Sequence, residues 1–424
     1  MREHSPHVTR AWVLHPDIKS DRERRDAHMA LDEAVALAVA LPDLEVVGSE
    51  IVPLPQPHAN ALFGTGKIAE LGERLKEAEV ELVLVDGPVT PVQQRNLEKA
   101  WKVKLLDRTG LILEIFSDRA ATREGVLQVE MAHLSYQRTR LVRAWTHLER
   151  QRGGLGFVGG PGETQIEADR RAIDEQLVRL RRQLDKVVKT RALHRKARAK
   201  VPYPIVALVG YTNAGKSTLF NRLTGAEVMA KDMLFATLDP TMRAVRLENG
   251  VDVILSDTVG FISDLPTELV AAFRATLEEV LEADLIVHVR DISHPNAQEQ
   301  ADDVHAILAS LGVAQSTPQI EVWNKIDRLP PESREAALTR AERTRGILAL
   351  SAWTGEGMAP LLDAIAESVE GDKREEALHL DFSDGRKRAW LFDRGLVEEE
   401  VQTDDGYDLT VRWTAREAAQ FEKV

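Results

Sequence analysis

The stretch LVGYTNAGKSTLF holds the residues whose types and spacing best suit phosphate chemistry. Gly210, Gly215 and Lys216, followed by Ser217, have the GxxxxGK[ST] spacing between a predicted strand, PIVALVG, and a predicted helix, STLFNRL. In that order the loop amides and the helix N-terminus surround phosphate, the lysine reaches the outer phosphates, and the serine hydroxyl binds Mg²⁺. The predicted phosphate-binding residues are Gly210, Tyr211, Thr212, Asn213, Ala214, Gly215, Lys216, Ser217 and Thr218.

Two later motifs add a metal ligand and a base-recognition site. In LSDTVGF, Asp257 is predicted to hold Mg²⁺, directly or through water, and the Gly260 amide to meet the γ-phosphate. In VWNKID, Asn324, Lys325 and Asp327 end another predicted strand. A carboxylate at Asp327 can accept hydrogen bonds from two neighbouring donors of guanine, and adenine has no such donor pair. The predicted ligand is therefore GTP, with GDP as the product of hydrolysis.

The stretches LSAWTGEG and LFATLDPT complete the predicted site. The backbone of Ser351 and Ala352 is predicted to contact the guanine oxygen. Thr237 is the predicted switch threonine, which closes on Mg²⁺ only when the γ-phosphate is present, and Thr241 is the alternative. The predicted Mg²⁺ ligands are Ser217, Thr237 and Asp257, and the predicted catalytic residues are Lys216, Thr237 and Gly260.

Two positions refine this GTPase prediction. Phe261 follows Gly260 and cannot orient an attacking water as a glutamine does, so that task falls to another group or to a partner. Slow intrinsic hydrolysis is therefore expected. Asn213 could hold a potassium ion beside the phosphates through its amide oxygen, although asparagine also occurs in loops that bind no ion.

Short apolar strands with helices between them must position these motifs. PIVALVG, VDVILSDT, DLIVHVRD, PQIEVWN and GILALS predict a doubly wound α/β domain over residues 201–371. Residues 1–115 alternate in the same way and predict a small N-terminal α/β domain with a mainly parallel sheet, and residues 372–424 predict a small C-terminal α+β module. Within residues 1–115, the stretch FGTGKIAEL lacks the GxxxxGK spacing, and we interpret it as a tight turn rather than a second nucleotide site.

Residues 116–200 predict two long helices that pack as an antiparallel hairpin, from about Glu124 to Arg152 and from about Thr164 to Lys200. The second helix carries an apolar stripe of Ile166, Ile173, Leu177, Leu180 and Leu184. Six glycines lie between Gly153 and Gly162 at the tip of the hairpin. Such a run is either a slack linker or a loop whose backbone approaches a ligand closely.

The hairpin region is basic although the chain as a whole is acidic. From Asp118 to Lys200 there are 19 Lys and Arg residues against 10 Asp and Glu residues, in a chain whose formal net charge is −13. A local basic segment of this kind is expected where one module meets polyphosphate. Long basic helices can also be ordinary solvated faces, so both interpretations stay open here.

Composition excludes several classes of protein. The chain has no cysteine, which excludes a disulfide framework, a thiolate zinc site and a cysteine nucleophile. It shows no signal peptide and no apolar run of the about 20 residues that a membrane span needs. We expect a soluble cytoplasmic protein, at most peripherally associated with a membrane, and a monomer.

The chain resembles the HflX family of ribosome-associated GTPases. The motifs that carry the resemblance include QQRNLEKA, DRTGLILEIF, EGVLQVEMAHLSYQRTRL, GGPGETQIEADRR, GYTNAGKSTLFNRLTGA, LFATLDPTMR and DTVGFISDLP, and they span about Gly64 to about Gly371. Phe261 also matches the family pattern. The resemblance implies that the N-terminal domain and the hairpin bind the large ribosomal subunit, that the GTP state dissociates stalled or idle ribosomes, and that the ribosome stimulates hydrolysis.

The resemblance further implies that the hairpin tip reaches ribosomal RNA near the peptidyl-transferase region, and no DNA partner is expected. The implied tip residues are Arg152, Gly153, Gly154, Phe157, Gly160 and Gly162. The arginines expected to neutralise RNA phosphates are Arg138, Arg140, Arg143, Arg150 and Arg152. Phe157 and Val158 stand where we expect a more polar or basic step, so Phe157 is a candidate for base stacking.

Two other functions would use the same nucleotide site. One is a GTPase for assembly or quality control of the large subunit, and the other is a GTP-gated signalling switch that acts on another protein. Salt-sensitive binding to the ribosome would distinguish the signalling switch from the other two, because phosphate contacts release counterions and protein contacts largely do not.

Overall fold

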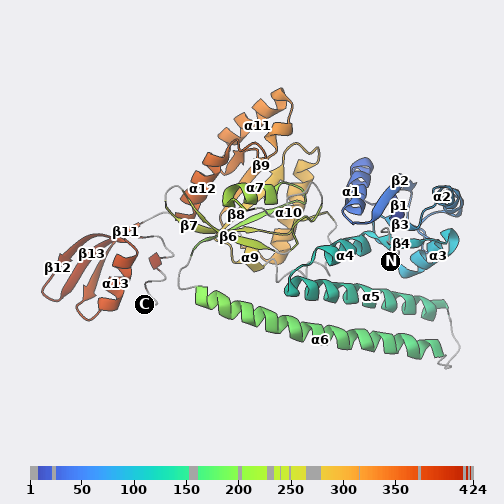
Figure 1. Ribbon diagram of the computed structural model, residues 1–424, viewed down its shortest axis with the longest axis horizontal. Helices are drawn as coiled ribbons and strands as arrows, with labels where there is room; N and C mark the ends of the chain where they lie inside the picture. Colours follow the sequence, from blue (N-terminus) through green and yellow to red (C-terminus); the bar gives the residue numbers. More distant parts are fainter. Residues whose placement is uncertain are drawn as a thin grey trace, which may run out of the picture.

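The computed structural model describes residues 8–21, 25–151, 161–198, 203–226, 234–238, 240–247, 250–263, 278–314, 316–370, 374–413, 417–418 and 421. Figure 1 shows the GTPase-like domain in the middle, an N-terminal α/β domain at one end and a C-terminal module at the other. A pair of long helices runs beneath the first two. Within the described ranges, no helix combines the length and the apolar character needed to cross a membrane.

The N-terminal domain is a four-stranded parallel sheet with helices on both faces. Its elements are β1 (Thr9–Ile18), α1 (Ala27–Val39), β2 (Leu44–Leu54), α2 (Thr65–Glu77), β3 (Leu82–Val85), α3 (Pro91–Trp101), β4 (Lys104–Asp107) and α4 (Arg108–Arg119), and the strand order is β2-β1-β3-β4. Side chains of α2 and α3 pack on one face of the sheet, and those of α1 and α4 pack on the other. The boundary predicted after residue 115 falls inside α4, so this domain continues to Arg119.

The FGTGKIAEL stretch is not a phosphate loop. Gly64 is the N-cap of α2, and the helix begins at Thr65. The Lys67 ammonium donates to Glu50 at 2.5 Å and to Glu70 at 3.2 Å, so two carboxylates already neutralise it. This agrees with the interpretation of the segment as a turn before a helix.

The two long helices are α5 (Arg123–Gln151) and α6 (Pro161–Arg198), which lie side by side and antiparallel in Figure 1. The predicted stripe faces the partner helix: Leu180 is buried, and Ile173, Leu177 and Leu184 are half-buried. The side chain of Ile166 lies outside the described part. The second helix starts at Pro161, earlier than predicted, because proline fits the first turn of a helix, where its missing N–H costs nothing.

The carboxylate of Asp107 joins the N-terminal domain to the hairpin. It caps α4 by accepting from the Gly110 amide at 2.8 Å. It also accepts from the Tyr136 hydroxyl at 2.6 Å and from Arg140 Nη1 at 2.9 Å, both on α5. Burial, and secondarily the charge of Asp107, raise the pKa of Tyr136, so its hydroxyl remains a donor. One buried side chain therefore links the start of α4 to the middle of α5.

The GTPase-like domain is a six-stranded sheet in the order β10-β9-β8-β5-β7-β6, in which only β6 runs antiparallel to its neighbour. Its elements are β5 (Ile205–Gly210), α7 (Lys216–Thr224), β6 (Thr241–Arg246), β7 (Asp252–Asp257), α9 (Glu278–Leu281), β8 (Leu285–Asp291), α10 (Ala297–Leu311), β9 (Gln319–Asn324), a 3-10 turn η1 (Ile326–Arg328), α11 (Pro331–Arg343), β10 (Ile347–Ala349) and α12 (Met358–Glu370). The parallel strands β5, β7 and β9 all end at one edge, where open α/β sheets bind their ligands.

The C-terminal module has its own core. It consists of β11 (Arg374–Asp381), α13 (Gly385–Asp393), β12 (Val397–Gln402) and β13 (Gly406–Trp413), with the antiparallel order β11-β13-β12. The turn at DDGY joins β12 to β13, as the sequence predicts. Leu391, Leu409 and Val411 are among the buried residues between the helix and the sheet.

Replacing Asp107 with asparagine tests the junction between domain and hairpin. The D107N variant keeps one acceptor oxygen but loses the charge that pairs with Arg140, so the free energy of unfolding should fall by about 1–3 kcal/mol. Chemical denaturation followed by circular dichroism measures this change. The matched control is D118N, at an exposed carboxylate 3.5 Å from Arg119, which should change stability by less than about 0.5 kcal/mol. Equal effects of the two substitutions would contradict a special role for Asp107.

Candidate nucleotide-binding site

Two glycines allow the loop between β5 and α7 to curl tightly. Gly210 has a φ of +153°, and a Cβ there would lie 2.2 Å from the Val289 carbonyl oxygen. Gly215 has a φ of +96°, and a Cβ there would lie 2.2 Å from the Asn324 amide nitrogen. The loop can therefore close over the end of the sheet only because these positions carry no side chain. The loop ends at Gly215, and α7 begins at Lys216.

Lys216 lies at the centre of this loop and is buried. Its ammonium donates to the Tyr211 carbonyl at 2.9 Å and to the Gly210 carbonyl at 3.2 Å. Burial lowers the pKa of Lys216 to about 8, against the opposite effect of the Asp257 charge. A phosphate group bound in the loop would place a negative charge beside the buried ammonium and stabilise its charged form.

Three oxygen-bearing side chains converge beside Lys216. Ser217 Oγ lies 2.7 Å from Asp257 Oδ2 and 2.8 Å from Thr237 Oγ1, and Thr237 Oγ1 lies 3.0 Å from Asp257 Oδ2. The second carboxylate oxygen, Asp257 Oδ1, is buried with no hydrogen-bond partner among the described residues. Burial raises the pKa of Asp257. A hard cation such as Mg²⁺ prefers oxygen ligands of this kind, so these three side chains fit it.

The structure distinguishes the two candidate switch threonines. Thr237 is buried against Ser217 and Asp257. Thr241 begins β6 and pairs with Asp257 only through the antiparallel ladder. The side chain of Thr237 is therefore the one that joins the other two predicted metal ligands.

A pocket lies over these residues, and Gly260 forms part of its wall. A Cβ at Gly260 would lie 2.8 Å from the Thr212 Cα and 3.1 Å from the Lys216 ammonium, so a larger residue would fill the space. Phe235 and Ala236, which the sequence interpretation did not include, also line it. The full lining is Thr212, Asn213, Gly215, Lys216, Ser217, Thr218, Phe235, Ala236, Thr237, Thr258 and Gly260.

Phe261 is fully buried in the core beneath the pocket. Its backbone forms a bridge with the phosphate loop: the Thr212 amide donates to the Phe261 carbonyl at 2.7 Å, and the Phe261 amide donates to the Gly210 carbonyl at 3.1 Å. The ring cannot reach a water molecule in the pocket from this position. The side chain after Gly260 therefore takes no part in orienting the nucleophile.

The residues predicted to recognise guanine lie beside the phosphate loop. Asn324 donates to the Ala214 carbonyl at 2.8 Å and accepts from the Ala352 amide at 2.9 Å, so it ties two loops together. Lys325 donates to the Asn213 carbonyl at 2.6 Å and pairs with Asp291 at 2.8 Å. Asp327 is exposed on η1, just beyond these contacts.

The loop at Ser351 and Ala352 differs in one respect from the expectation. The Ser351 amide donates to the Glu356 carbonyl at 3.0 Å, and the Ala352 amide donates to Asn324, so both N–H groups already have acceptors in the protein. A contact to the guanine oxygen would require one of them to exchange partners. Arg222, which the sequence interpretation missed, holds this loop from α7 by donating to the Ala352 carbonyl at 2.7 Å.

The predicted RNA-binding tip falls mostly beyond the described ranges. Arg152, Gly153, Gly154, Phe157 and Gly160 are all outside them, whereas Gly162 lies in the first turn of α6 and not in a loop. The side chains of Arg143 and Arg150 are not described either.

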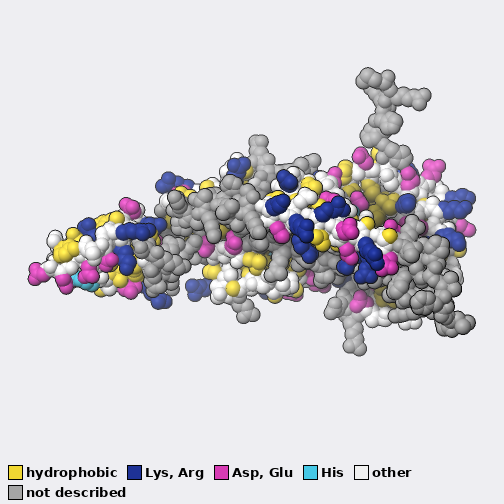
Figure 2. Space-filling model, turned by 90° about the horizontal axis from the view of Figure 1, so that it is seen from below, with side chains coloured by type: hydrophobic (Ala, Val, Ile, Leu, Met, Phe, Trp, Pro, Cys, Tyr) yellow, Lys and Arg dark blue, Asp and Glu magenta, His cyan; other side chains and the backbone are white. Residues whose placement is uncertain are grey.

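Two arginines of α5 that were expected to neutralise RNA phosphates, Arg138 and Arg140, already have carboxylate partners in the protein. The Arg140 side chain is 18% exposed and is bound to Asp107, and Arg138 pairs with Asp174 of α6 at 2.6 Å. The sequence showed their charge but not the carboxylates that face them. Figure 2, seen from the side of the hairpin, accordingly shows Lys and Arg side chains interspersed with Asp and Glu.

Replacing Asp327 with asparagine tests the base specificity of the site. The D327N variant presents one amide donor where guanine offers another donor, so its preference should shift from guanine to xanthine nucleotides by at least about tenfold. Competition binding with GDP and xanthosine diphosphate measures the shift. The E332Q variant, at an exposed carboxylate on the following helix α11, serves as a control and should keep the guanine preference. Unchanged selectivity of D327N would refute the role of Asp327.

Comparison with known proteins gives matches over most of the chain. Family models match along the chain: "GTP-binding GTPase N-terminal" over residues 28–117, "GTP-binding GTPase Middle Region" over 119–198, "50S ribosome-binding GTPase" over 205–325 and "HflX C-terminal domain" over 336–424. A solved GTP-binding protein from Sulfolobus solfataricus, in complex with GDP, is 22% identical, with a TM-score of 0.44, and the alignment covers 85% of this chain and 98% of that one.

Curated relatives are closer. GTPase HflX of Magnetococcus marinus is 50% identical over 94% of this chain and 89% of the relative. GTPase HflX of Escherichia coli is 45% identical over 82% of each chain. With this identity to GTPase HflX relatives over most of its length, this chain belongs to the HflX family of GTPases and is a GTP hydrolase.

Proposed function

We propose that this GTPase binds the large ribosomal subunit and, in its GTP state, dissociates stalled or idle ribosomes, and that the subunit stimulates hydrolysis. The observation that carries the proposal is the match of residues 205–325 to the family described as a 50S ribosome-binding GTPase. The burial of Phe261 supports it, because the side chain that follows Gly260 cannot position water. A partner that completes the site would explain how hydrolysis becomes fast.

The hairpin supplies the surface for ribosomal RNA in this proposal. In the described side chains of α6, residues 167–187 carry six basic and five acidic residues, so this central part is nearly neutral. Residues 188–200 carry six basic residues and no acidic one. The positive charge that could neutralise RNA phosphates is therefore concentrated near the end of the hairpin that joins the GTPase domain, together with Arg143, Arg150 and Arg152 at the opposite end.

The glycine-rich tip, with Arg152, Gly153, Gly154, Phe157 and Gly160, is proposed to enter a narrow RNA cavity, where small residues let the backbone approach. Phe157 would stack on an unpaired base. The protein would work as a monomer in the cytoplasm, where ribosomes are found, and without a DNA partner.

Each residue of the nucleotide site has a task in the proposed reaction. Lys216 and the loop amides bind and orient the phosphates, and Gly260 leaves room for the γ-phosphate. Ser217, Thr237 and Asp257 would hold Mg²⁺, which neutralises charge on the phosphate oxygens when it is bound. Because Thr237 reaches the metal ligands from the loop before β6, its position can report whether the γ-phosphate is present.

The main test is GTP turnover with and without purified large ribosomal subunits. We expect stimulation of at least about tenfold, which should fade with added salt. Raising the salt from about 50 to about 200 mM should weaken binding to the subunit at least about tenfold, since each phosphate contact releases counterions. No stimulation, at concentrations where GTP is bound, would refute the proposal and favour a protein-directed signalling switch.

Deletion of residues 153–162 is the matched variant for this assay. It should leave intrinsic turnover unchanged and remove the stimulation. If stimulation survives the deletion, the tip is only a linker. Sedimentation of intact ribosomes with the GTP-loaded protein then separates splitting from subunit assembly, because only a splitting factor converts intact ribosomes into subunits.

Asn213 is proposed to hold a potassium ion beside the phosphates. Its φ of 59° and its exposed position at the loop surface leave the side chain at the rim of the pocket. Turnover should be at least about threefold faster in potassium than in sodium salts, because the added positive charge stabilises the developing charge on the phosphates. The N213A variant should lose this difference. Equal rates of the parent protein in both salts would exclude the ion.

A further inference from the structure

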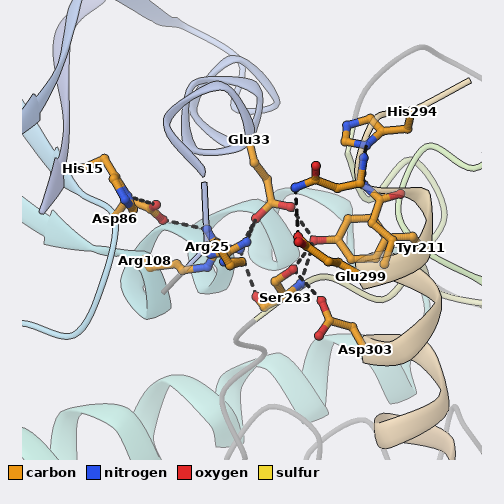
Figure 3. Close-up of polar contacts among 12 residues, drawn as sticks. His15, Arg25, Glu33, Asp86, Arg108, Tyr211, Ser263, His294, Glu299 and Asp303 are labelled. Carbon is orange, nitrogen blue, oxygen red and sulfur yellow. Dashed lines mark hydrogen bonds and ion pairs between the residues drawn. The ribbon is translucent and has the colours of Figure 1, made fainter. Parts of the chain in front are cut away.

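A network of polar side chains connects the N-terminal domain to the phosphate loop. Figure 3 shows Glu33 of α1 and Arg108 of α4 pointing toward Tyr211, which follows β5, and toward Ser263, which lies three positions after Gly260. All four side chains are buried or half-buried. The contacts join residues that are far apart in the sequence and that belong to two domains.

Tyr211 is the junction of this network. Its hydroxyl donates to the Glu33 carboxylate and accepts from the Ser263 amide at 2.8 Å. The hydroxyl also lies 2.6 Å from Ser263 Oγ, which in turn donates to Asp303 of α10 at 2.7 Å. Burial, together with the Glu33 charge, raises the pKa of Tyr211, so the hydroxyl keeps its proton. The Tyr211 hydroxyl thereby connects the phosphate loop, to which Tyr211 belongs, with Ser263 in the segment after Gly260.

Arg108 supports this junction from the N-terminal domain. Its side chain is 5% exposed and donates to Asp86 at 2.6 Å and to Glu33 at 2.5 Å. The same guanidinium donates to the Ser263 carbonyl at 2.9 Å. A buried guanidinium needs fixed acceptors, and here two are carboxylates of its own domain and one is the backbone of the GTPase domain. Arg108 therefore holds Glu33 in place and touches the segment after Gly260 directly.

An apolar contact connects α4 to Phe235, which lies close to Thr237 in the sequence. The Phe116 ring of α4 packs edge-on against the Phe235 ring, with centroids 4.7 Å apart and an interplanar angle of 84°. Phe235 lines the nucleotide pocket and precedes Thr237 by two positions. The N-terminal domain therefore contacts three segments of the nucleotide site: the phosphate loop, the segment with Thr237 and the segment after Gly260.

We propose that Glu33, Arg108 and Phe116 of the N-terminal domain are positioning residues for GTP hydrolysis, which hold Thr237 and Gly260 in place through Phe235, Tyr211 and Ser263. The proposal concerns hydrolysis by the free protein and does not depend on the ribosomal partner. Thr237 and Gly260 serve the γ-phosphate, whereas Lys216 and Ser217 serve phosphates that GDP also has. Loss of the network should therefore affect the GTP state more than the GDP state.

Two isosteric variants test the proposal. In E33Q, the side chain has one oxygen and one NH₂ group, so it can accept from Arg108 or from Tyr211 but not from both. In Y211F, the ring stays in the core, but the acceptor of the Ser263 amide and the donor to Glu33 are gone. We expect each variant to lower kcat for intrinsic hydrolysis about tenfold, with less than about a twofold change in GDP affinity.

The matched control is K67Q in the same domain. It breaks the ion pair of Lys67 with Glu50, two residues of the N-terminal domain, and should leave kcat unchanged. All rates are measured below the melting temperature of each variant, and binding of GDP and of a non-hydrolysable GTP analogue is measured in parallel. Because E33Q and Y211F break the same path, the double variant should be about as slow as either single variant.

Three results would overturn the proposal. An unchanged kcat in E33Q and Y211F would show that the network only joins the domains. Equal losses of GDP and GTP-analogue affinity would indicate general damage to the phosphate loop. A double variant slowed by the product of the two single effects, about a hundredfold, would show that Glu33 and Tyr211 act independently.

Discussion

The burial of Lys216 and Asp257 at one edge of a parallel sheet is the constraint on which the nucleotide site depends. Burial lowers the pKa of the ammonium and raises that of the carboxylate, because each loses the hydration of its charged form. In the proposed site, a phosphate would pair with the Lys216 ammonium and Mg²⁺ would pair with the Asp257 carboxylate. The glycines at 210, 215 and 260 serve the same end, because the anion must approach the backbone where a Cβ would already touch its neighbours.

The same packing removes Phe261 from the chemistry. Its backbone is paired with the phosphate loop, and its ring lies in the core, so the segment after Gly260 is a structural continuation of the loop. Because Phe261 is fixed at one end of this segment, the position of the segment also depends on the contacts made at its other end. That end is Ser263, whose amide, hydroxyl and carbonyl are all bound to Tyr211, Asp303 or Arg108. One of these three contacts, that of Arg108, comes from outside the GTPase domain.

Short-range features of the site could be predicted from the sequence, and contacts between domains could not. The GxxxxGK[ST] spacing and the strand before it placed Lys216 and Ser217, and the common edge of parallel strands placed Asp257 beside them. The pairing of Arg222 with the Ala352 carbonyl, or of Glu33 with Tyr211, depends on how separate elements dock. For the same reason the sequence shows the charge of Arg140 but not that Asp107 faces it.

The strand order of the N-terminal domain creates a switch point at the carboxyl edge of its sheet. In the order β2-β1-β3-β4, the chain changes direction across the sheet between β1 and β3, and such a switch point is where doubly wound domains bind ligands. Here His15 of β1 binds Asp86, the residue after β3, at 2.8 Å, and Asp86 in turn binds Arg108. Arg108 then extends to Ser263. Side chains at this edge therefore hold Arg108, which contacts the GTPase domain. Under the proposal above, the docking of the two domains and the geometry of the nucleotide site are coupled through this residue.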